Sequence, residues 1–244
     1  MNLLYERYHS KSKLQNHIIS DDNYTYRNLL SAVRNYIKPS RTILDIGCGV
    51  GTIDFYLASK GGCVTGLDIS KSAITIANRN ADLLRVGNNT KFLISDFPNS
   101  KINGEYNMIL ILEVIEHLLD DRKVIKECYQ LLKDGGILIL STRSKNEVLY
   151  KLGIEKTHDQ RVGHLRRYSV KELIKIISSF GFSVLEVKKT EGLVRDSLFV
   201  FPKFGDPIIR VANNFRFFSD LLTFIDNIFL KLFGESQIYI IAKK

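Results

Sequence analysis

A strand that runs directly into a glycine-rich turn is the feature that most constrains the fold of this chain. Residues 43–51 read ILDIGCGVG, an apolar run followed by glycines at alternate positions. Glycines in such a turn let the backbone approach a ligand where any Cβ would collide. The segment therefore predicts a nucleotide-type site at the carboxyl end of a buried strand in an open α/β sheet.

The rest of the chain repeats the same strand-then-helix pattern. Apolar runs bounded by Gly or Asp alternate with helical patterns, which is typical of a parallel sheet with crossover helices. Before the first strand, Asp21 or Asp22 is expected to cap a helix that runs to about Ile37 and covers the nucleotide-binding edge. We expect seven strands at Thr42–Ile46, Cys63–Leu67, Lys91–Ser95, Tyr106–Leu112, Gly136–Ser141, Phe182–Val187 and Gln237–Ala242.

Composition favours one ordinary globular domain over residues 1–244. With 45% hydrophobic and 25% charged residues, the chain can form one substantial core. Its three cysteines lack C-x-x-C spacing, which indicates neither a disulfide framework nor a thiolate metal cage. The N-terminus lacks the apolar core of a signal peptide, and no stretch of transmembrane length is free of charge, so we expect a cytoplasmic protein.

Acidic residues near the turn indicate the kind of ligand. The glycine spacing is G-x-G-x-G, and Asp45 lies two residues before the first glycine, where a carboxylate suits a cationic amine and sulfonium better than a pyrophosphate. Asp68 ends the second strand and could accept hydrogen bonds from both ribose hydroxyls, with Ile69 against an adenine. After the third strand, Asp96 and Phe97 suit the adenine amino group and ring face, although Asp96 alone could be a plain turn residue.

Taken in order, LDIGCGVG, VTGLDIS, SDF and LLKDGGILILST resemble the motifs of class I S-adenosylmethionine-dependent methyltransferases, over roughly Tyr26 to Val187. The resemblance implies a Rossmann-like, doubly wound α/β fold, with seven strands in the order 3-2-1-4-5-7-6 and the last strand antiparallel. It also implies S-adenosylmethionine as the methyl donor. The residues expected around the donor are Asp45, Gly47, Cys48, Gly49, Gly51, Asp68, Ile69, Asp96, Phe97 and Leu112.

A second group of polar residues follows the fourth strand, in LEVIEHL. In a helical turn, Glu113, Glu116 and His117 would share one face at the ligand-binding edge of the sheet. The E-x-x-E-H pattern resembles that of ubiquinone-biosynthesis O-methyltransferases and, more distantly, of plant small-RNA 2′-O-methyltransferases. The latter resemblance implies a magnesium site completed by a downstream histidine. His164, which precedes a helix that Ser169 can cap, is the candidate.

The role of this group stays open between three hypotheses. In the first, Glu113, Glu116, His117 and His164 hold Mg²⁺, which would bind the acceptor hydroxyl and lower its pKa. In the second, Glu116, His117 and His164 are catalytic without a metal, one of the histidines acting as the base. In the third, His117 only orients the substrate or caps a helix.

Arginines and the remaining histidines are less informative. Arg166 and Arg167 could clamp an acidic group on the acceptor, or could simply form a solvated face. His9, His17 and His158 are expected to be ordinary polar residues.

Segments at the two ends are expected to surround the substrate. Residues 1–40 would form a helical lid, and 189–236 a helical insertion between the last two strands that covers the substrate side. Asp206 and Pro207 could start a helix there, and 208–233 reads as one or two amphipathic helices. Most such apolar faces complete a core, but this one could instead wall an acceptor pocket, join a dimer or contact a membrane, the last weakened by sparse basic residues. The face comprises Phe215, Phe218, Leu222, Ile225 and Phe229.

We therefore expect an enzyme that O-methylates a small or lipid-like hydroxylated acceptor. The alternatives are an RNA ribose 2′-O-methyltransferase and a cofactor-binding but inactive partner subunit. The net charge of +9 is not concentrated in a basic segment with aromatic platforms, so the sequence disfavours nucleic acid. The glutamates and histidine after the fourth strand argue against the inactive partner. Oligomeric state is not predicted.

Overall fold

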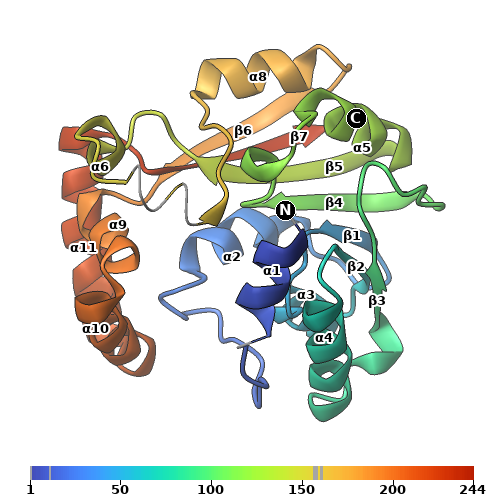
Figure 1. Cartoon of the computed structure of the whole chain (residues 1–244), viewed down its shortest axis with the longest axis horizontal. Helices are drawn as coiled ribbons and strands as arrows, with labels where there is room; N and C mark the ends of the chain where they lie inside the picture. Colours follow the sequence, from blue (N-terminus) through green and yellow to red (C-terminus); the bar gives the residue numbers. More distant parts are fainter. Residues whose placement is uncertain (1, 11, 156–158, 160–161) are drawn as a thin grey trace.

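The computed structural model describes residues 2–10, 12–155, 159 and 162–244. Its seven strands form one sheet in the order β3-β2-β1-β4-β5-β7-β6 (Figure 1). Strand β7 pairs antiparallel with β5 and β6, and the remaining neighbours pair in parallel. The predicted strand order and the antiparallel last strand are confirmed. The strands are β1 (Thr42–Ile46), β2 (Cys63–Asp68), β3 (Thr90–Ile94), β4 (Tyr106–Leu112), β5 (Leu132–Arg143), β6 (Ser183–Thr190) and β7 (Gln237–Lys243).

Helices occupy the connections and cover both faces of the sheet (Figure 1). Helix α8 begins at the cap that the sequence predicts, because Ser169 forms a capping box with Glu172, and at the start of α4 Ser70 accepts a hydrogen bond from Ala73 N. The described helices are α1 (Asn2–His9), α2 (Arg27–Val33), α3 (Thr52–Ser59), α4 (Lys71–Leu83), α5 (Asp121–Leu131), α6 (Val148–Lys151), α8 (Val170–Ser178), α9 (Leu193–Val200), α10 (Pro202–Asn214) and α11 (Arg216–Phe233), with 3₁₀ turns η1 (Arg34–Tyr36), η2 (Gly87–Asn89) and η3 (Ile115–His117).

Two helix starts differ from the sequence prediction. The helix expected from Asp21 or Asp22 begins only at Arg27, and the Asp21 carboxylate instead accepts a hydrogen bond from the Tyr56 hydroxyl. In the insertion, α10 begins at Pro202 and contains Pro207 in its interior. The backbone N–H at the first position of a helix has no partner within the helix, so a proline, which lacks this N–H, costs nothing there. Pro202 therefore starts the helix as well as Pro207 could.

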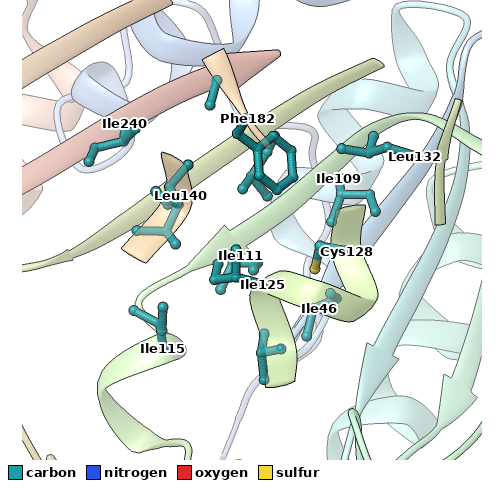
Figure 2. Packing of buried hydrophobic residues seen from close by; sticks show 14 of the residues in the cluster. Ile46, Ile109, Ile111, Ile115, Ile125, Cys128, Leu132, Leu140, Phe182 and Ile240 are labelled. Atoms are coloured by element: carbon teal, nitrogen blue, oxygen red, sulfur yellow. The ribbon is translucent and has the colours of Figure 1, made fainter. Parts of the chain in front are cut away.

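The central strands of the sheet are buried on both faces. Along β4, Ile109 and Ile111 point into one apolar layer with α5 and α8, of which Figure 2 shows part. The alternate residues Met108 and Leu110 point into the opposite layer, which contains residues of α2 and α3. Parallel strands with continuous apolar runs require this double cover. The carboxyl ends of β1, β2, β4 and β5 are thereby fixed relative to one another, and the functional groups described below lie there.

Helices α9, α10 and α11 form the insertion between β6 and β7, at the left edge of Figure 1. The apolar face of 208–233, expected to complete a core, is only partly covered: Phe218, Leu222, Ile225 and Phe229 are half-buried, and Phe215 is exposed. Among the described residues, no helix combines the length and hydropathy needed to cross a bilayer. The buried residues of 193–233 are all polar or small, namely Arg195, Asp196, Gly205, Ala212, Ser219 and Asp226.

Candidate active site

The glycine turn after β1 has the backbone that only glycine adopts easily. Gly47, Gly49 and Gly51 all have positive φ, at 80°, 56° and 86°. A Cβ on Gly47 would lie 2.3 Å from Val114 Cγ2, so a side chain there would force the neighbouring loop away. The amides of Gly47 and Cys48 both donate to Leu67 O, at 2.7 and 2.9 Å, which fastens the turn to β2. The result is a rigid backbone cradle.

Cys48 contributes to this cradle through its backbone only. Its side chain is buried beneath the turn in an apolar cluster with Phe55 and Phe92. Its Sγ lies 2.8 Å from the position that a Cβ on Gly66 would occupy, so Gly66 makes room for it. The structure therefore offers no contact between the Cys48 thiol and a ligand in the turn.

Asp45 is a buried acid at the end of β1 with an unmet hydrogen-bonding requirement. Its Oδ1 has no hydrogen-bond partner among the described residues. Burial raises the pKa of Asp45 to about 7, and burial together with the charge of Asp45 raises the pKa of the neighbouring Asp54 well above its usual range. An orphaned buried carboxyl oxygen is unfavourable unless a partner arrives. A cationic ligand group would supply that partner.

Asp68 is held in one orientation at the end of β2. Its Oδ2 accepts from Gly49 N at 2.9 Å, and its Oδ1 accepts from Ser70 N at 2.8 Å. Each carboxylate oxygen has a further lone pair, so two hydroxyl donors could still be accommodated. Ile69 is half-buried beside it, and so is Leu112 at the end of β4. A role of this carboxylate in binding ribose stays a prediction.

The two residues predicted at the adenine differ in their accessibility. Asp96 is exposed after β3, where its Oδ2 accepts from Asn99 Nδ2 at 3.2 Å. Phe97 is only 6% exposed, because its ring packs in the main core cluster with Leu67. The ring of Phe97 therefore presents no open face for stacking, which corrects the sequence prediction.

Helix α1 lies over the glycine turn. It carries Tyr5, from the N-terminal stretch expected to form a lid, and His9, whose place here the sequence did not predict. Glu6 accepts hydrogen bonds from Lys71 N and Ser72 N, at the N-terminus of α4. The Tyr5 ring meets the His117 ring edge-on at a centroid distance of 5.7 Å. His9 Cε1 lies 3.4 Å from the position of a Cβ on Gly49, so His9 is not the ordinary polar residue expected.

Tyr5 and His9 share an unusual property. The Tyr5 hydroxyl and His9 Nδ1 are buried without a hydrogen-bond partner among the described residues. Burial is the main cause that raises the pKa of Tyr5 to about 12 and lowers the pKa of His9. Nothing in the sequence marks His9 as a site residue, because it is far from the motifs and reaches the turn only through the fold.

After β4, Glu113 separates from the residues predicted to join it. Glu113 has a positive φ of 56°, so the chain turns before η3 begins and the expected shared helical face is not formed. Its Oε1 accepts from Ser141 Oγ at 2.8 Å and from Gln237 Nε2 at 3.0 Å. Glu116, His117 and His164 each have a possible metal-binding atom within 4.8 Å of those of the other two. Glu113 is not part of this group.

Glu116 is buried with one oxygen unsatisfied. Its Oε2 accepts from Thr142 Oγ1 at 2.8 Å, while Oε1 has no partner among the described residues. Burial, helped by the charge of Glu113, raises the pKa of Glu116 well above its usual range. The carboxyl therefore suits either a proton or an incoming cation.

His117 is positioned to offer a lone pair. Its Nδ1 lies 3.1 Å from Gly163 O, and since a carbonyl only accepts, Nδ1 carries the proton and Nε2 does not. Burial lowers the pKa of His117 to about 4, so the ring is neutral at physiological pH. The His164 ring lies beside it at a centroid distance of 4.8 Å, and His164 Nδ1 is 2.8 Å from Asp159 Oδ1.

A cluster of buried ion pairs supports this region from behind. Arg143, at the end of β5, contacts Glu147 at 2.7 Å, Glu155 at 3.2 Å and Asp196 at 2.5 Å. Arg167 is buried against Glu147, Glu155 and Asp159, and it therefore connects the cluster to the partner of His164. The three carboxylates that could otherwise hold a metal, Glu147, Glu155 and Asp196, already surround guanidinium groups.

The predicted arginine clamp is therefore wrong. Arg167 is consumed by the buried cluster, and Arg166 contacts Asp121 at 3.1 Å and Leu119 O at 2.9 Å. His17 is exposed and forms a contact with Asn16, as expected of an ordinary polar residue. His158 lies outside the described residues.

Comparison with known proteins agrees with this geometry. Residues 37–178 match the family described as a methyltransferase domain. The ubiquinone biosynthesis O-methyltransferase of Coxiella burnetii is 29% identical over 191 residues, which cover 69% of this chain and 81% of that protein. The protein of the same description from Pseudomonas paraeruginosa is 29% identical over 114 residues, 47% of this chain. The chain spans about half the length of this second relative, 49%.

A solved structure shows the same fold. The magnesium protoporphyrin IX methyltransferase from Synechocystis PCC 6803, with bound SAH, superposes with a TM-score of 0.62 at 19% identity, covering 98% of this chain and 93% of that one. The family match extends from just before β1 through α8 and includes the glycine turn, Asp68 and the group around His117. The chain belongs to the class I S-adenosylmethionine-dependent methyltransferases.

Proposed function

We propose that this chain transfers a methyl group from S-adenosylmethionine to a hydroxyl oxygen of a small or lipid-like acceptor. The observation that carries the proposal is the neutral His117 imidazole, grouped with Glu116 and His164 and in edge contact with Tyr5 of the helix over the donor turn. A hydroxyl must lose its proton when it is methylated, so a base at this place suits oxygen as the acceptor atom. The ubiquinone biosynthesis relatives support the same choice.

In the proposed reaction the acceptor oxygen forms a bond to the methyl carbon while the bond from that carbon to sulfur breaks. The sulfonium becomes a thioether, and the hydroxyl proton passes to Nε2 of His117. Attack by oxygen makes this proton strongly acidic, so an imidazole with a pKa of about 4 can accept it. Alignment of the two substrates and exclusion of water supply the rest of the rate enhancement.

The donor would lie in the cradle formed by Gly47, Gly49 and Gly51. Its ammonium group would satisfy the orphaned oxygen of Asp45, and its ribose hydroxyls would donate to Asp68. Ile69, Asp96 and Leu112 would border the adenine and the donor's inner end. Within the N-terminal segment 1–40, α1 would act as the lid, latched by Glu6 to α4. The unsatisfied polar atoms of Tyr5 and His9 support this closure, because each lacks a partner that a bound donor could provide.

Mg²⁺ offers the same group a second role. Glu116, His117 and His164 would hold the cation, and the unpartnered Oε1 of Glu116 supports this possibility. These three ligands are a mixed set: the carboxylate suits Mg²⁺, whereas the two imidazoles suit borderline ions such as Zn²⁺. A bound cation would lower the pKa of the acceptor hydroxyl. Glu113 would remain outside this set.

Transfer of a tritiated methyl group into fractionated cell extract tests the proposal. We expect label in a small-molecule or lipid fraction, with S-adenosylhomocysteine as the second product, and no label with Asp68→Ala. Parallel reactions with Mg²⁺ and with a chelator determine whether the group around His117 needs a metal. Label in RNA would favour ribose methylation instead, and donor binding without label in any fraction would favour an inactive partner subunit.

A further inference from the structure

Helix α11 is held to the protein by polar contacts and exposes a row of apolar residues to solvent. On α11, Asp220 and Thr223 bind Arg27 of α2, at 2.6 and 2.5 Å. Asp226 accepts hydrogen bonds from the backbone amides of Gly192 and Arg195, each at 2.8 Å. Polar contacts thus fix α11 on the chain. The helix has half-buried apolar residues on its inner side, Phe218, Leu222, Ile225 and Phe229, and a second set of apolar residues that stays exposed.

The outward side of α11 is a continuous apolar stripe. Its residues recur every three or four positions, so they share one face of the helix. Phe217 is 82% exposed and Phe224 is 65% exposed. The complete stripe is Phe217, Leu221, Phe224, Ile228 and Leu232, all of them exposed.

Helix α10 also exposes apolar residues. Phe204 and Val211 lie two helical turns apart and are exposed, Phe204 by 77%, and Phe215, which joins the two helices, is exposed as well. The two helices pack against each other and against α9. Gly205 permits the close contact with α9, because a Cβ there would lie 1.7 Å from Leu198 O. Together the two stripes form what we call the α10–α11 face.

Charge distinguishes between the possible occupants of this face. Lys203, Arg210 and Lys231 are exposed on the same two helices. Asp220 is shared between Arg27 and the exposed Arg216, at 2.6 and 3.8 Å, and Asp206 is the other exposed acid on these two helices. The whole chain carries a net charge of +9. In a symmetric pair of chains these cations would face one another, whereas an anionic lipid surface complements them.

We propose that the α10–α11 face docks on an anionic lipid bilayer. The phenylalanine and leucine side chains would enter the boundary between headgroups and acyl chains, and the flanking lysines and arginines would contact lipid phosphates. The helices would lie in the plane of the surface, held to the chain by the Arg27 and Asp226 contacts. This docking does not depend on which acceptor is methylated.

Cosedimentation with vesicles tests the docking. We compare phosphatidylcholine vesicles with vesicles that also contain phosphatidylglycerol, using the full chain. Wild-type chain should bind the anionic vesicles, and added salt should weaken the binding. The double variant Phe217→Ser and Phe224→Ser should lose affinity for the vesicles by at least about tenfold. Leu83→Ser, at an exposed apolar residue on α4, is the matched control and should bind like wild type.

A second variant tests the contribution of charge. Replacing Arg210 and Lys231 with glutamine should weaken binding to anionic vesicles by about fivefold per charge and leave neutral vesicles unaffected. Affinity for S-adenosylhomocysteine should stay unchanged in all variants, which shows that they are folded. Absence of wild-type binding, or equal binding to both kinds of vesicle, overturns the proposal. A dimer in sedimentation velocity that the Phe217 and Phe224 substitutions dissociate, together with no binding to vesicles, would likewise overturn it and would indicate a second copy of the chain as the occupant.

Discussion

Replacing Asp68 with alanine should abolish useful donor binding. The carboxylate holds Gly49 N and Ser70 N and, in the proposed complex, accepts hydrogen bonds from both ribose hydroxyls. Hydrogen bonds to a charged group contribute about 1.5–3 kcal/mol each, so loss of the two ribose bonds alone removes about 3–6 kcal/mol. This corresponds to a roughly 10²- to 10⁴-fold weaker Kd.

Isothermal titration with S-adenosylhomocysteine measures this effect directly. Asp96→Ala is the control, because Asp96 is an exposed residue for which a single adenine contact is proposed, and we expect a loss of about tenfold. Circular dichroism separates weaker binding from unfolding, since Asp68 also ties the turn to α4. A folded Asp68→Ala protein whose Kd stays within about fivefold of wild type would refute the assignment of this carboxylate to the ribose.

Three further predictions concern turnover, pH and stability. His117→Ala should leave donor affinity unchanged and reduce kcat by about 10²-fold or more, measured as methyl transfer to the identified acceptor; an unchanged kcat would exclude His117 as the base. Burial raises the pKa of Asp45 to about 7, and a cationic donor requires the ionised form of this carboxyl. Donor affinity measured by calorimetry should therefore fall by up to tenfold per pH unit as the pH drops below 7, and Asp45→Asn should flatten that slope. Arg143→Met should lower the free energy of unfolding by about 3–5 kcal/mol at neutral pH, because it leaves buried carboxylates uncompensated. This loss should shrink at lower pH, where those carboxylates can protonate in the folded state, and an equal loss at both pH values in urea titrations would contradict the explanation.

The sheet was predictable because its information is local. Each buried parallel strand is a short apolar run bounded by Gly or Asp, and β1 and β4 begin and end where the pattern predicts. Strand β5 extends further than expected, to Leu132–Arg143, because its ends pair with β4 and β7 at residues that lack the apolar signature. Pairing with neighbours, which a single sequence does not display, sets those limits.

Site residues within a motif were predictable, and those brought in by tertiary contacts were not. Asp45, Asp68 and the glycines follow their strands directly, so the fold positions them as soon as the strands are placed. Tyr5 and His9 reach the turn only because α1 folds back over it. Helical spacing could not reveal that Glu113 adopts a positive φ and turns toward Ser141 and Gln237.

The insertion shows the limit of amphipathic pattern as a guide to burial. The spacing in 208–233 correctly indicates helices, but it does not state which side faces the protein. That choice depends on contacts with residues outside the segment: Arg27 pairs with Asp220, and the backbone amides of Gly192 and Arg195 bind the buried Asp226. A periodic apolar stripe identifies a surface in need of a partner, and the partner must be found in the surrounding structure.

A crystal structure of the chain with S-adenosylhomocysteine is the most direct test of the donor site. The account predicts the ribose on Asp68, the amino group at Asp45 and the ligand enclosed between the glycine turn and Tyr5 and His9 of α1. An empty crevice at saturating ligand, or a nicotinamide dinucleotide bound there instead, would contradict it.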